Sequence, residues 1–257
     1  MYYPIQVPYI LNKTFSQHIL YLEEIVPSLQ DFIICLWEMT PKVSEKKSIQ
    51  NIIASDGCID LVVYYNEKWI GFAGMSKTDF HSVIQTSDKY FGARMKPGAF
   101  HQLTGLPATE AMDKSVLLKT LDPSFDVEAF FSLSFEQAKV YFKNYLHKFI
   151  CGKEPNHFVK MFDALSTSPP STAAELYQTF DFNPRQCQRL FMKHFGISPQ
   201  KALSVLRFQR CLEVLSSNKA NPNDVLEVTT YYDQSHFIND FKRNIGLTPF
   251  EYLEKNK

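Results

Sequence analysis

Between residues 29 and 101 the apolar positions fall into short runs separated by turn residues, a pattern typical of β-strands. Turn-forming pairs such as Asp56-Gly57 and Pro97-Gly98 separate runs that are rich in β-branched and aromatic residues. The runs are residues 32–39, 50–55, 59–65, 69–74 and 90–96. This part of the chain is therefore predicted to form a β-rich domain.

From residue 99 onward the apolar positions follow the helical period, most clearly over residues 136–150. The inward face of that helix is expected to carry Ala138, Tyr141, Phe142, Tyr145, Leu146 and Phe149. Gly152 can end it, and Asn156 can cap a further helix over 157–165. The sequence thus predicts two domains: residues 1–150, β-rich with C-terminal helices, and residues 154–257, all helical, with 166–172 as an internal loop.

The second domain contains an internal repeat at an offset of fifty residues. Residues 191–199 (FMKHFGISP) match residues 241–249 (FKRNIGLTP). Each copy has a glycine that can end a helix in the left-handed conformation, then Ser or Thr as an N-cap and Pro at the first helical position. The chain is therefore predicted to end one helix and begin another in the same way twice.

At the same offset Asn183 matches Asp233, and both are good N-caps. They predict helices over 184–195 and 234–245. Each is preceded by a short amphipathic stretch, residues 172–180 and 223–231, and by a turn of about three residues. Helix, tight turn and helix is the geometry of the helix-turn-helix, whose second helix enters the DNA major groove.

The helix over 184–195 carries a polar face suited to reading bases, opposite its apolar stripe. This face holds Arg185, Gln188, Arg189 and Lys193. Arginine can make paired hydrogen bonds to guanine and glutamine to adenine, each pair giving about 1–3 kcal/mol of discrimination. The alternative is an ordinary solvated basic face. Six basic and no acidic residues between positions 182 and 212 favour a phosphate-binding stripe: Arg185, Arg189, Lys193, Lys201, Arg207 and Arg210.

The helix over 234–245 is chemically weaker at the equivalent positions, which are Ser235, Ile238 and Asn239. Gln234 and Ser235 are expected to reach bases or phosphates, while Lys242 and Arg243 are expected to hold the DNA backbone. His236 is interpreted as a capping or packing residue. We therefore expect the first helix to discriminate sequence and the second to position the protein.

These residues resemble the AraC/XylS family of bacterial transcription regulators, whose DNA-binding domain has two helix-turn-helix motifs joined by a long helix. The resemblance covers roughly residues 155–257. It rests on 183–191 (NPRQCQRLF), 195–199 (FGISP), 206–215 (LRFQRCLEVL), 231–242 (YYDQSHFINDFK) and 246–249 (GLTP).

The resemblance implies that the joining helix, about residues 199–217, presents both reading helices to successive major grooves of double-stranded operator DNA, about 34 Å apart. It places base contacts on Arg185, Gln188, Arg189, Gln234, Ser235 and Asn239. Two positions depart from the family: an arginine is common where this chain has Asn239, and a glycine where it has Thr230. The resemblance also implies further partners: a small-molecule effector, a second copy of the chain and, if the protein is an activator, RNA polymerase.

The first domain is similar to the sensor-type domain that precedes this DNA-binding domain in one AraC-type subgroup. The matching segments are 55–61 (SDGCIDL), 91–99 (FGARMKPGA) and 106–110 (LPATE). By analogy a small cupin-like β-barrel is implied, so the fold class expected for the whole chain is α+β.

An effector pocket in the mouth of such a barrel is predicted from polar residues set among apolar strands. Its candidate residues are Trp37, Asp56, Cys58, Asp60 and Arg94, with Tyr64, Trp69 and Phe91 as further walls. The alternative is purely structural: Asp56-Gly57 forms a turn that Asp60 caps, Arg94 pairs with either carboxylate, and Cys58 is a small buried residue.

Composition narrows the function further. The 257 residues include 27 Lys+Arg and 27 Asp+Glu, so indiscriminate polyanion binding is not expected, and residues 154–257 alone hold 12 basic and 11 acidic residues. No apolar run approaches the roughly 20 residues of a membrane span. No secretory signal opens the chain, so we expect a cytoplasmic protein without a membrane partner. Five scattered cysteines and seven histidines show no metal-ligand spacing, so no metal or cofactor is expected.

Two other functions stay open on the sequence alone. One is a cupin-like enzyme with a helical regulatory domain, although no nucleophile motif, phosphate loop or paired carboxylates indicate catalysis. The other is a DNA-binding regulator without a ligand, whose first domain only dimerises. The leading hypothesis is a sequence-specific DNA-binding regulator, not an enzyme, controlled by an effector.

Overall fold

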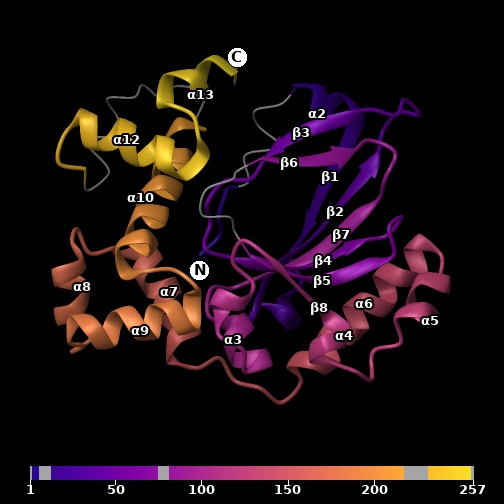
Figure 1. Ribbon diagram of the computed structural model, residues 1–257, viewed down its shortest axis with the longest axis horizontal. Helices are drawn as coiled ribbons and strands as arrows, with labels where there is room; N and C mark the ends of the chain where they lie inside the picture. Colours follow the sequence, from indigo (N-terminus) through magenta and orange to yellow (C-terminus); the bar gives the residue numbers. More distant parts are fainter. Residues whose placement is uncertain (1, 6–12, 75–80, 217–230, 256–257) are drawn as a thin grey trace.

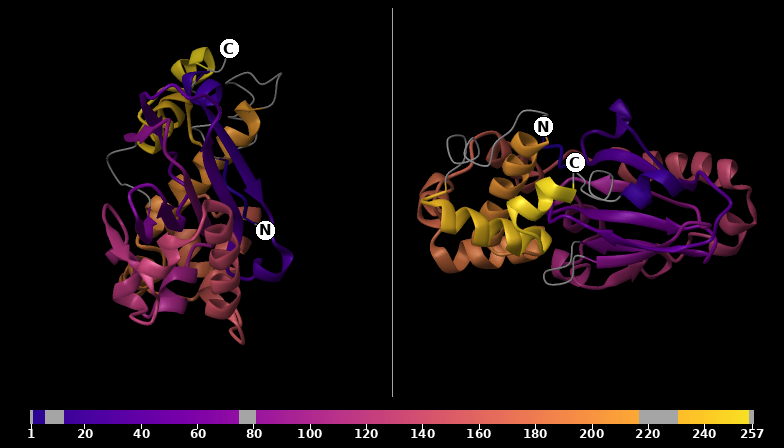
Figure 2. Two further views of the ribbon diagram at one scale, coloured as in Figure 1. Left: turned by 90° about the vertical axis from the view of Figure 1, so that its right-hand side faces the viewer. Right: turned by 90° about the horizontal axis from the view of Figure 1, so that it is seen from above.

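The computed structural model describes residues 2–5, 13–74, 81–216 and 231–255. A β-rich half with helices packed around it lies beside a helical half that begins at α7 (His157–Thr167) (Figure 1; Figure 2). The α+β fold class expected from the sequence is confirmed, with the strands in the first half and helices alone in the described part of the second.

The larger of two antiparallel sheets has six strands in the order β1-β2-β7-β4-β5-β8. Their bounds are β1 Ile19–Glu24, β2 Ile33–Pro41, β7 Tyr90–Met95, β4 Ile59–Tyr64, β5 Trp69–Gly74 and β8 Ser115–Leu117. The smaller sheet pairs β3 (Ser48–Ile52) with β6 (His81–Gln85) and lies across one face of the larger sheet (Figure 1). A short helix, α2 (Lys13–His18), leads into β1.

Alternation along β7 assigns its side chains to two environments. Phe91 packs edge-to-face on Phe142 of α6 (Phe135–Ile150), at 5.3 Å between ring centroids. Gly92 lies on the opposite face, where a Cβ atom would come within 2.7 Å of the Trp37 ring. Glycine is therefore required there, because it lets the Trp37 indole lie directly against the backbone of β7.

The helices that follow the sheet are short except for α6. They are α3 (Ala99–Thr104), the 3-10 turn η2 (Ala108–Glu110), α4 (Leu118–Leu121), α5 (Val127–Ser132) and α6. Ser134 and Gln137 form a capping box that fixes the start of α6. Together α5 and α6 cover the Phe91 face of the large sheet with aromatic rings.

The helical half contains α7, the first predicted helix-turn-helix and, within the described residues, the second helix of the second one. Its remaining described helices are α8 (Ala173–Thr179), α9 (Pro184–Phe195), α10 (Pro199–Leu215), α12 (Gln234–Ile245) and α13 (Pro249–Lys255). α9 and α12 begin and end at the predicted residues. Gly196 and Gly246 close them in the left-handed conformation, at φ values of 74° and 77°.

The two halves share a continuous hydrophobic core. In α7, Phe162 contacts Tyr2 edge-to-face on one side and Phe195 of α9 on the other, at 5.2 and 5.4 Å between centroids. Lys96 is 8% exposed as a residue, and its ammonium group donates to the Asp163 carboxylate at 2.9 Å. The end of α9 also lies against α3 and η2, where a Cβ on Gly196 would meet Met112 at 2.7 Å. Separating the halves would therefore expose aromatic surface.

The structure departs from the predicted pattern at Tyr141 and at strands β1 and β8, of which β8 lies in the region predicted to be helical. Tyr141 is 43% exposed on α6, although its ring still contacts Phe125 and Phe130. Strand β1 lies before the region predicted to be β-rich. The helix predicted over 223–231 and the departure at Thr230 lie outside the described residues, apart from position 231.

Candidate DNA-binding helices and effector cavity

The α9 helix is fixed at its start by a side-chain cap and along its length by buried aromatics. Asn183 Oδ1 accepts a hydrogen bond from the Gln186 backbone N–H at 2.8 Å. Cys187, Phe191 and Phe195 are at most 1% exposed. The opposite face is exposed to solvent and holds all four predicted contact residues: Arg185, Gln188, Arg189 and Lys193. Among described residues, none of its three cations forms an ion pair.

The α12 helix repeats this construction. Asp233 Oδ1 accepts from the His236 backbone N–H at 2.7 Å, and Phe237 and Phe241 are buried. The predicted contact residues are exposed on the outer side: Gln234, Ser235, Asn239, Lys242 and Arg243. Both helices therefore present polar side chains outward from an aromatic core, as a groove-reading helix requires.

A buried polar network fixes α12 to α10. Asp240, 4% exposed, accepts from Ser204 Oγ at 2.7 Å and from Tyr231 Oη at 3.2 Å, and lies 3.6 Å from Arg207 Nε. The Lys201 ammonium donates to Asn244 Oδ1 at 2.9 Å, and burial lowers the pKa of this lysine.

This network corrects the charge stripe proposed from the sequence. Lys201 and Arg207 serve the packing between α10 and α12, and Arg210 pairs with Glu213 one turn away on α10. The exposed cations of the first motif that make no ion pair with a described residue are Arg185, Arg189 and Lys193. The sequence alone could not show this, because the partners of Lys201 and Arg207 lie more than thirty residues away.

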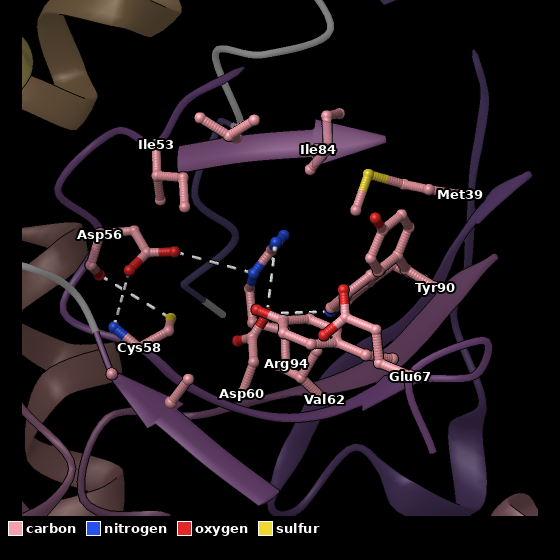
Figure 3. A pocket seen from close by; sticks show the side chains of 15 residues that line it. Met39, Ile53, Asp56, Cys58, Asp60, Val62, Glu67, Ile84, Tyr90 and Arg94 are labelled. Atoms are coloured by element: carbon pink, nitrogen blue, oxygen red, sulfur yellow. Dashed lines mark hydrogen bonds and ion pairs between the residues drawn. The ribbon is translucent and has the colours of Figure 1, made fainter. Parts of the chain in front are cut away.

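The β-rich half contains a cavity of about 200 Å³ between the large sheet and the β3–β6 ribbon (Figure 3). All five residues predicted to form an effector pocket line it: Trp37, Asp56, Cys58, Asp60 and Arg94. Tyr64 lines it as well, whereas Trp69 is absent from the lining and Phe91 faces α6. Whether these residues bind an effector remains a prediction.

Arg94 is the electrostatic centre of this cavity. Its side chain is 6% exposed and lies among three carboxylates. Nη1 is 3.1 Å from Glu23 Oε1, Nε is 3.7 Å from Asp56 Oδ2, and Nη2 is 3.7 Å from Asp60 Oδ2. The Nε atom is buried without a hydrogen-bond acceptor among the described residues. Acidic groups therefore outnumber the one cation.

The two aspartates are held in different ways. Asp56 Oδ1 accepts from the Cys58 backbone N–H at 2.8 Å, an arrangement that fixes the turn before β4. Asp60 Oδ2 accepts from Trp37 Nε1 at 2.8 Å. Burial raises the pKa of Asp60 to about 7, against the opposing effects of Arg94 and the Trp37 hydrogen bond. The turn at Asp56 and the pairing of Arg94 with carboxylates are thus present, whereas Asp60 bonds Trp37 and does not cap the turn; both aspartates still face the cavity.

Sequence reasoning missed several lining groups. Met39 and Tyr90 face the cavity from β2 and β7, and Glu67 lies exposed at its mouth. Glu23, behind Arg94, comes from β1, a strand that was not predicted from the sequence. A two-residue period counted back from Arg94 would have found Tyr90.

The described part of the chain contains neither a candidate membrane span nor a candidate metal site. No described helix has the length and apolarity needed to cross a membrane. Within the same residues, no group of three His, Cys, Asp or Glu side chains is placed to hold a metal ion.

Comparison with known proteins identifies the class of the second half. Residues 176–255 match the family described as "Helix-turn-helix domain", and residues 25–117 match a "Domain of unknown function (DUF6597)". The chain therefore carries an AraC-type helix-turn-helix domain, which confirms the resemblance stated from the sequence. An uncharacterized HTH-type transcriptional regulator of Bacillus subtilis, YtdP, is 27% identical over 86 residues, which are 34% of this chain and 11% of that regulator.

Solved structures of ToxT from Vibrio cholerae are also similar. One at 1.65 Å resolution has a TM-score of 0.40 and 12% identity, covering 93% of this chain and 98% of that one. Another, bound to an unsaturated fatty acid, has a TM-score of 0.37 and 11% identity, covering 92% and 93%. At these levels the likeness says nothing about what this chain binds.

Proposed function

We propose that this protein is a sequence-specific DNA-binding transcriptional regulator, with residues 154–257 as the DNA-binding domain and residues 1–150 as a sensor domain. The observation that carries this proposal is the pair of capped helices, α9 and α12, which both pack on α10 and both expose polar side chains outward. Such a protein would act in the cytoplasm, on double-stranded operator DNA.

In this proposal α9 supplies most of the sequence discrimination. Arg185, Gln188 and Arg189 contact bases, and Lys193 contacts a phosphate. On α12, Gln234, Ser235 and Asn239 face bases, while Lys242 and Arg243 hold the backbone. The exposure of all nine side chains supports this assignment.

Selection of bound sequences from random duplex DNA, followed by affinity measurement, tests the proposal. A preferred site with two short elements about one helical turn apart is expected. The variant Arg189→Ala should bind that site about 5- to 150-fold more weakly, the equivalent of one lost bidentate base contact. Lys160→Ala, at an exposed position on α7, is the matched control. Equal affinity of Arg189→Ala and the wild type would remove α9 from the role of reader.

We further propose that an effector in the cavity controls this DNA binding. The supporting observation is a short physical connection. Asp56 lines the cavity, and its neighbour Ser55 is bonded both to α12 of the second motif and to the joining helix α10. The Ser55 backbone N–H donates to the Asn244 carbonyl of α12 at 3.2 Å, and its carbonyl accepts from Gln209 Nε2 of α10 at 2.9 Å. A ligand that moves Asp56 would therefore act on both helices.

A further inference from the structure

The charge and wall chemistry of the cavity indicate which class of ligand fits it. Its lining contains three acidic side chains, Asp56, Asp60 and Glu67, and one basic side chain, Arg94. Arg94 is already placed between Asp56 and Asp60, with Glu23 behind it. An anionic ligand that reached the buried Nε atom of Arg94 would lie directly beside the carboxylates of Asp56 and Asp60. Burying like charges together in a site of low dielectric is costly, so anions are disfavoured.

The walls of the cavity favour a cation over a neutral ligand. The rings of Tyr64 and Tyr90 meet edge-to-face at 5.4 Å between centroids, and Trp37 lies on the same side of the large sheet. Aromatic faces attract ammonium and guanidinium groups electrostatically. Met39, Val62 and Ile84 supply an apolar surface beside the rings. The arrangement thus places Asp56 and Asp60 around Arg94, with Tyr90, Met39 and Ile84 to one side of them and Glu67 beside Tyr90 (Figure 3).

We propose that the cavity binds a small organic cation, a primary or secondary amine with an apolar body, whose ammonium group lies at Asp56 and Asp60. This inference rests on the proposed effector role and specifies its ligand. A cavity of about 200 Å³ accommodates about eight or nine non-hydrogen atoms, since benzene, with its six carbons, binds in an engineered cavity of about 150 Å³. The ammonium group would balance negative charge that Arg94 alone does not neutralise, since three carboxylates surround this one guanidinium group. Burial holds the pKa of Asp60 near 7, and a bound cation would lower it.

The test uses the full purified chain and three probes of nearly equal shape: 2-phenylethylamine, 2-phenylethanol and phenylacetate. Isothermal titration calorimetry at neutral pH is expected to show binding of the amine at least about tenfold tighter than binding of the alcohol or the acid. Pentylamine and propylamine extend the series, because affinity should fall as the apolar body shrinks.

Two isosteric variants locate the binding site. Asp60→Asn keeps an acceptor for Trp37 Nε1, and Asp56→Asn keeps one for the Cys58 N–H. Each should weaken amine binding about tenfold or more, since each removes a charged acceptor. Glu128→Gln, at an exposed position on α5, should bind the amine like the wild type. Near-UV circular dichroism checks that the variants keep the native packing of Trp37.

The inference is overturned if the acid or the alcohol binds as tightly as the amine, if neither aspartate variant weakens amine binding, or if no amine of the series binds up to about 10 mM. Failure of the DNA-binding proposal looks different. Arg189→Ala should leave amine affinity unchanged, and loss of amine binding in Asp60→Asn should leave binding to the selected DNA intact in the absence of ligand.

Discussion

His194 should make the stability of this protein strongly dependent on pH. Its ring is stacked on Phe158 at 3.5 Å between centroids and meets His101 edge-on at 4.5 Å, so it lies where α9, α7 and α3 come together. It is 8% exposed, and its Nδ1 atom has no hydrogen-bond partner among the described residues. Burial, reinforced by the charges of His101 and Lys193, lowers the pKa of His194 from 6.5 to about 4.

The direction of the effect follows from proton binding in the two states. Above about pH 6.5 His194 is neutral in the folded and in the unfolded chain, and its packing contributes fully. Between pH 6.5 and 4 His194 is protonated in the unfolded chain but stays neutral in the folded protein. The free energy of unfolding therefore decreases as the pH is lowered through this range. At 1.36 kcal/mol per pKa unit the loss amounts to about 3 kcal/mol. This is a large share of the 5–15 kcal/mol typical of a whole domain.

Urea unfolding between about pH 4 and 7.5, followed by tryptophan fluorescence and circular dichroism, measures this loss. His194→Phe keeps a ring against Phe158 and cannot be protonated, so its stability should fall about 3 kcal/mol less than that of the wild type over this range. Asp60, whose raised pKa favours the folded state at low pH, is present in both proteins and cancels in the comparison. The exposed His157 provides the control His157→Phe, which should follow the wild type. Parallel profiles for His194→Phe and the wild type would refute the reasoning.

Two further predictions concern the contact between the two halves of the protein, and a third concerns its binding to DNA. Gln209→Ala removes the bonds to the Ser55 carbonyl and to the Ile5 N–H but leaves the bond from the Ser55 N–H to Asn244. It is expected to reduce the effect of a cavity ligand on DNA affinity by about half in free energy, without weakening ligand binding. Calorimetry and DNA titration with and without ligand check this, and an undiminished effect would contradict it. Asp163→Ala leaves the buried Lys96 ammonium without its carboxylate partner, and this should lower the free energy of unfolding by about 3 kcal/mol. Urea unfolding measures the loss. A midpoint urea concentration equal to that of the wild type would contradict the prediction and would mean that water solvates the Lys96 ammonium in the variant. The exposed Lys and Arg residues of α9 and α12 number five, and each phosphate contact contributes about −0.9 to the salt dependence of DNA binding. A plot of the logarithm of the binding constant against the logarithm of the salt concentration should therefore have a slope no steeper than about −5. A slope near −10 would refute this prediction.

Local signals made the helical repeat predictable to the residue, whereas the cavity was predictable only in part. Asn183 and Asp233 cap the helices that directly follow them, and Gly196 and Gly246 end the same helices, so no distant information is needed. Phe91 was wrongly expected in the pocket, although it lies three positions from Arg94 and strand alternation puts it on the other face. The partnership of Arg94 with Glu23 could not be read from the sequence, because it depends on how β1 pairs with β2 and β2 with β7.

The packing between the halves limits how an effector could work. The first motif shares the main core with the sheet through Tyr2, Phe162 and Phe195, so moving α9 as a rigid body would expose large aromatic surfaces. The second motif meets the β-rich half through a smaller contact, centred on the two hydrogen bonds of Ser55 beside the buried Ala54. Each such bond contributes about 1 kcal/mol net. A ligand acting through them would therefore shift DNA affinity by about 2 kcal/mol, or roughly thirtyfold, and it would do so by adjusting α12 relative to a fixed α9.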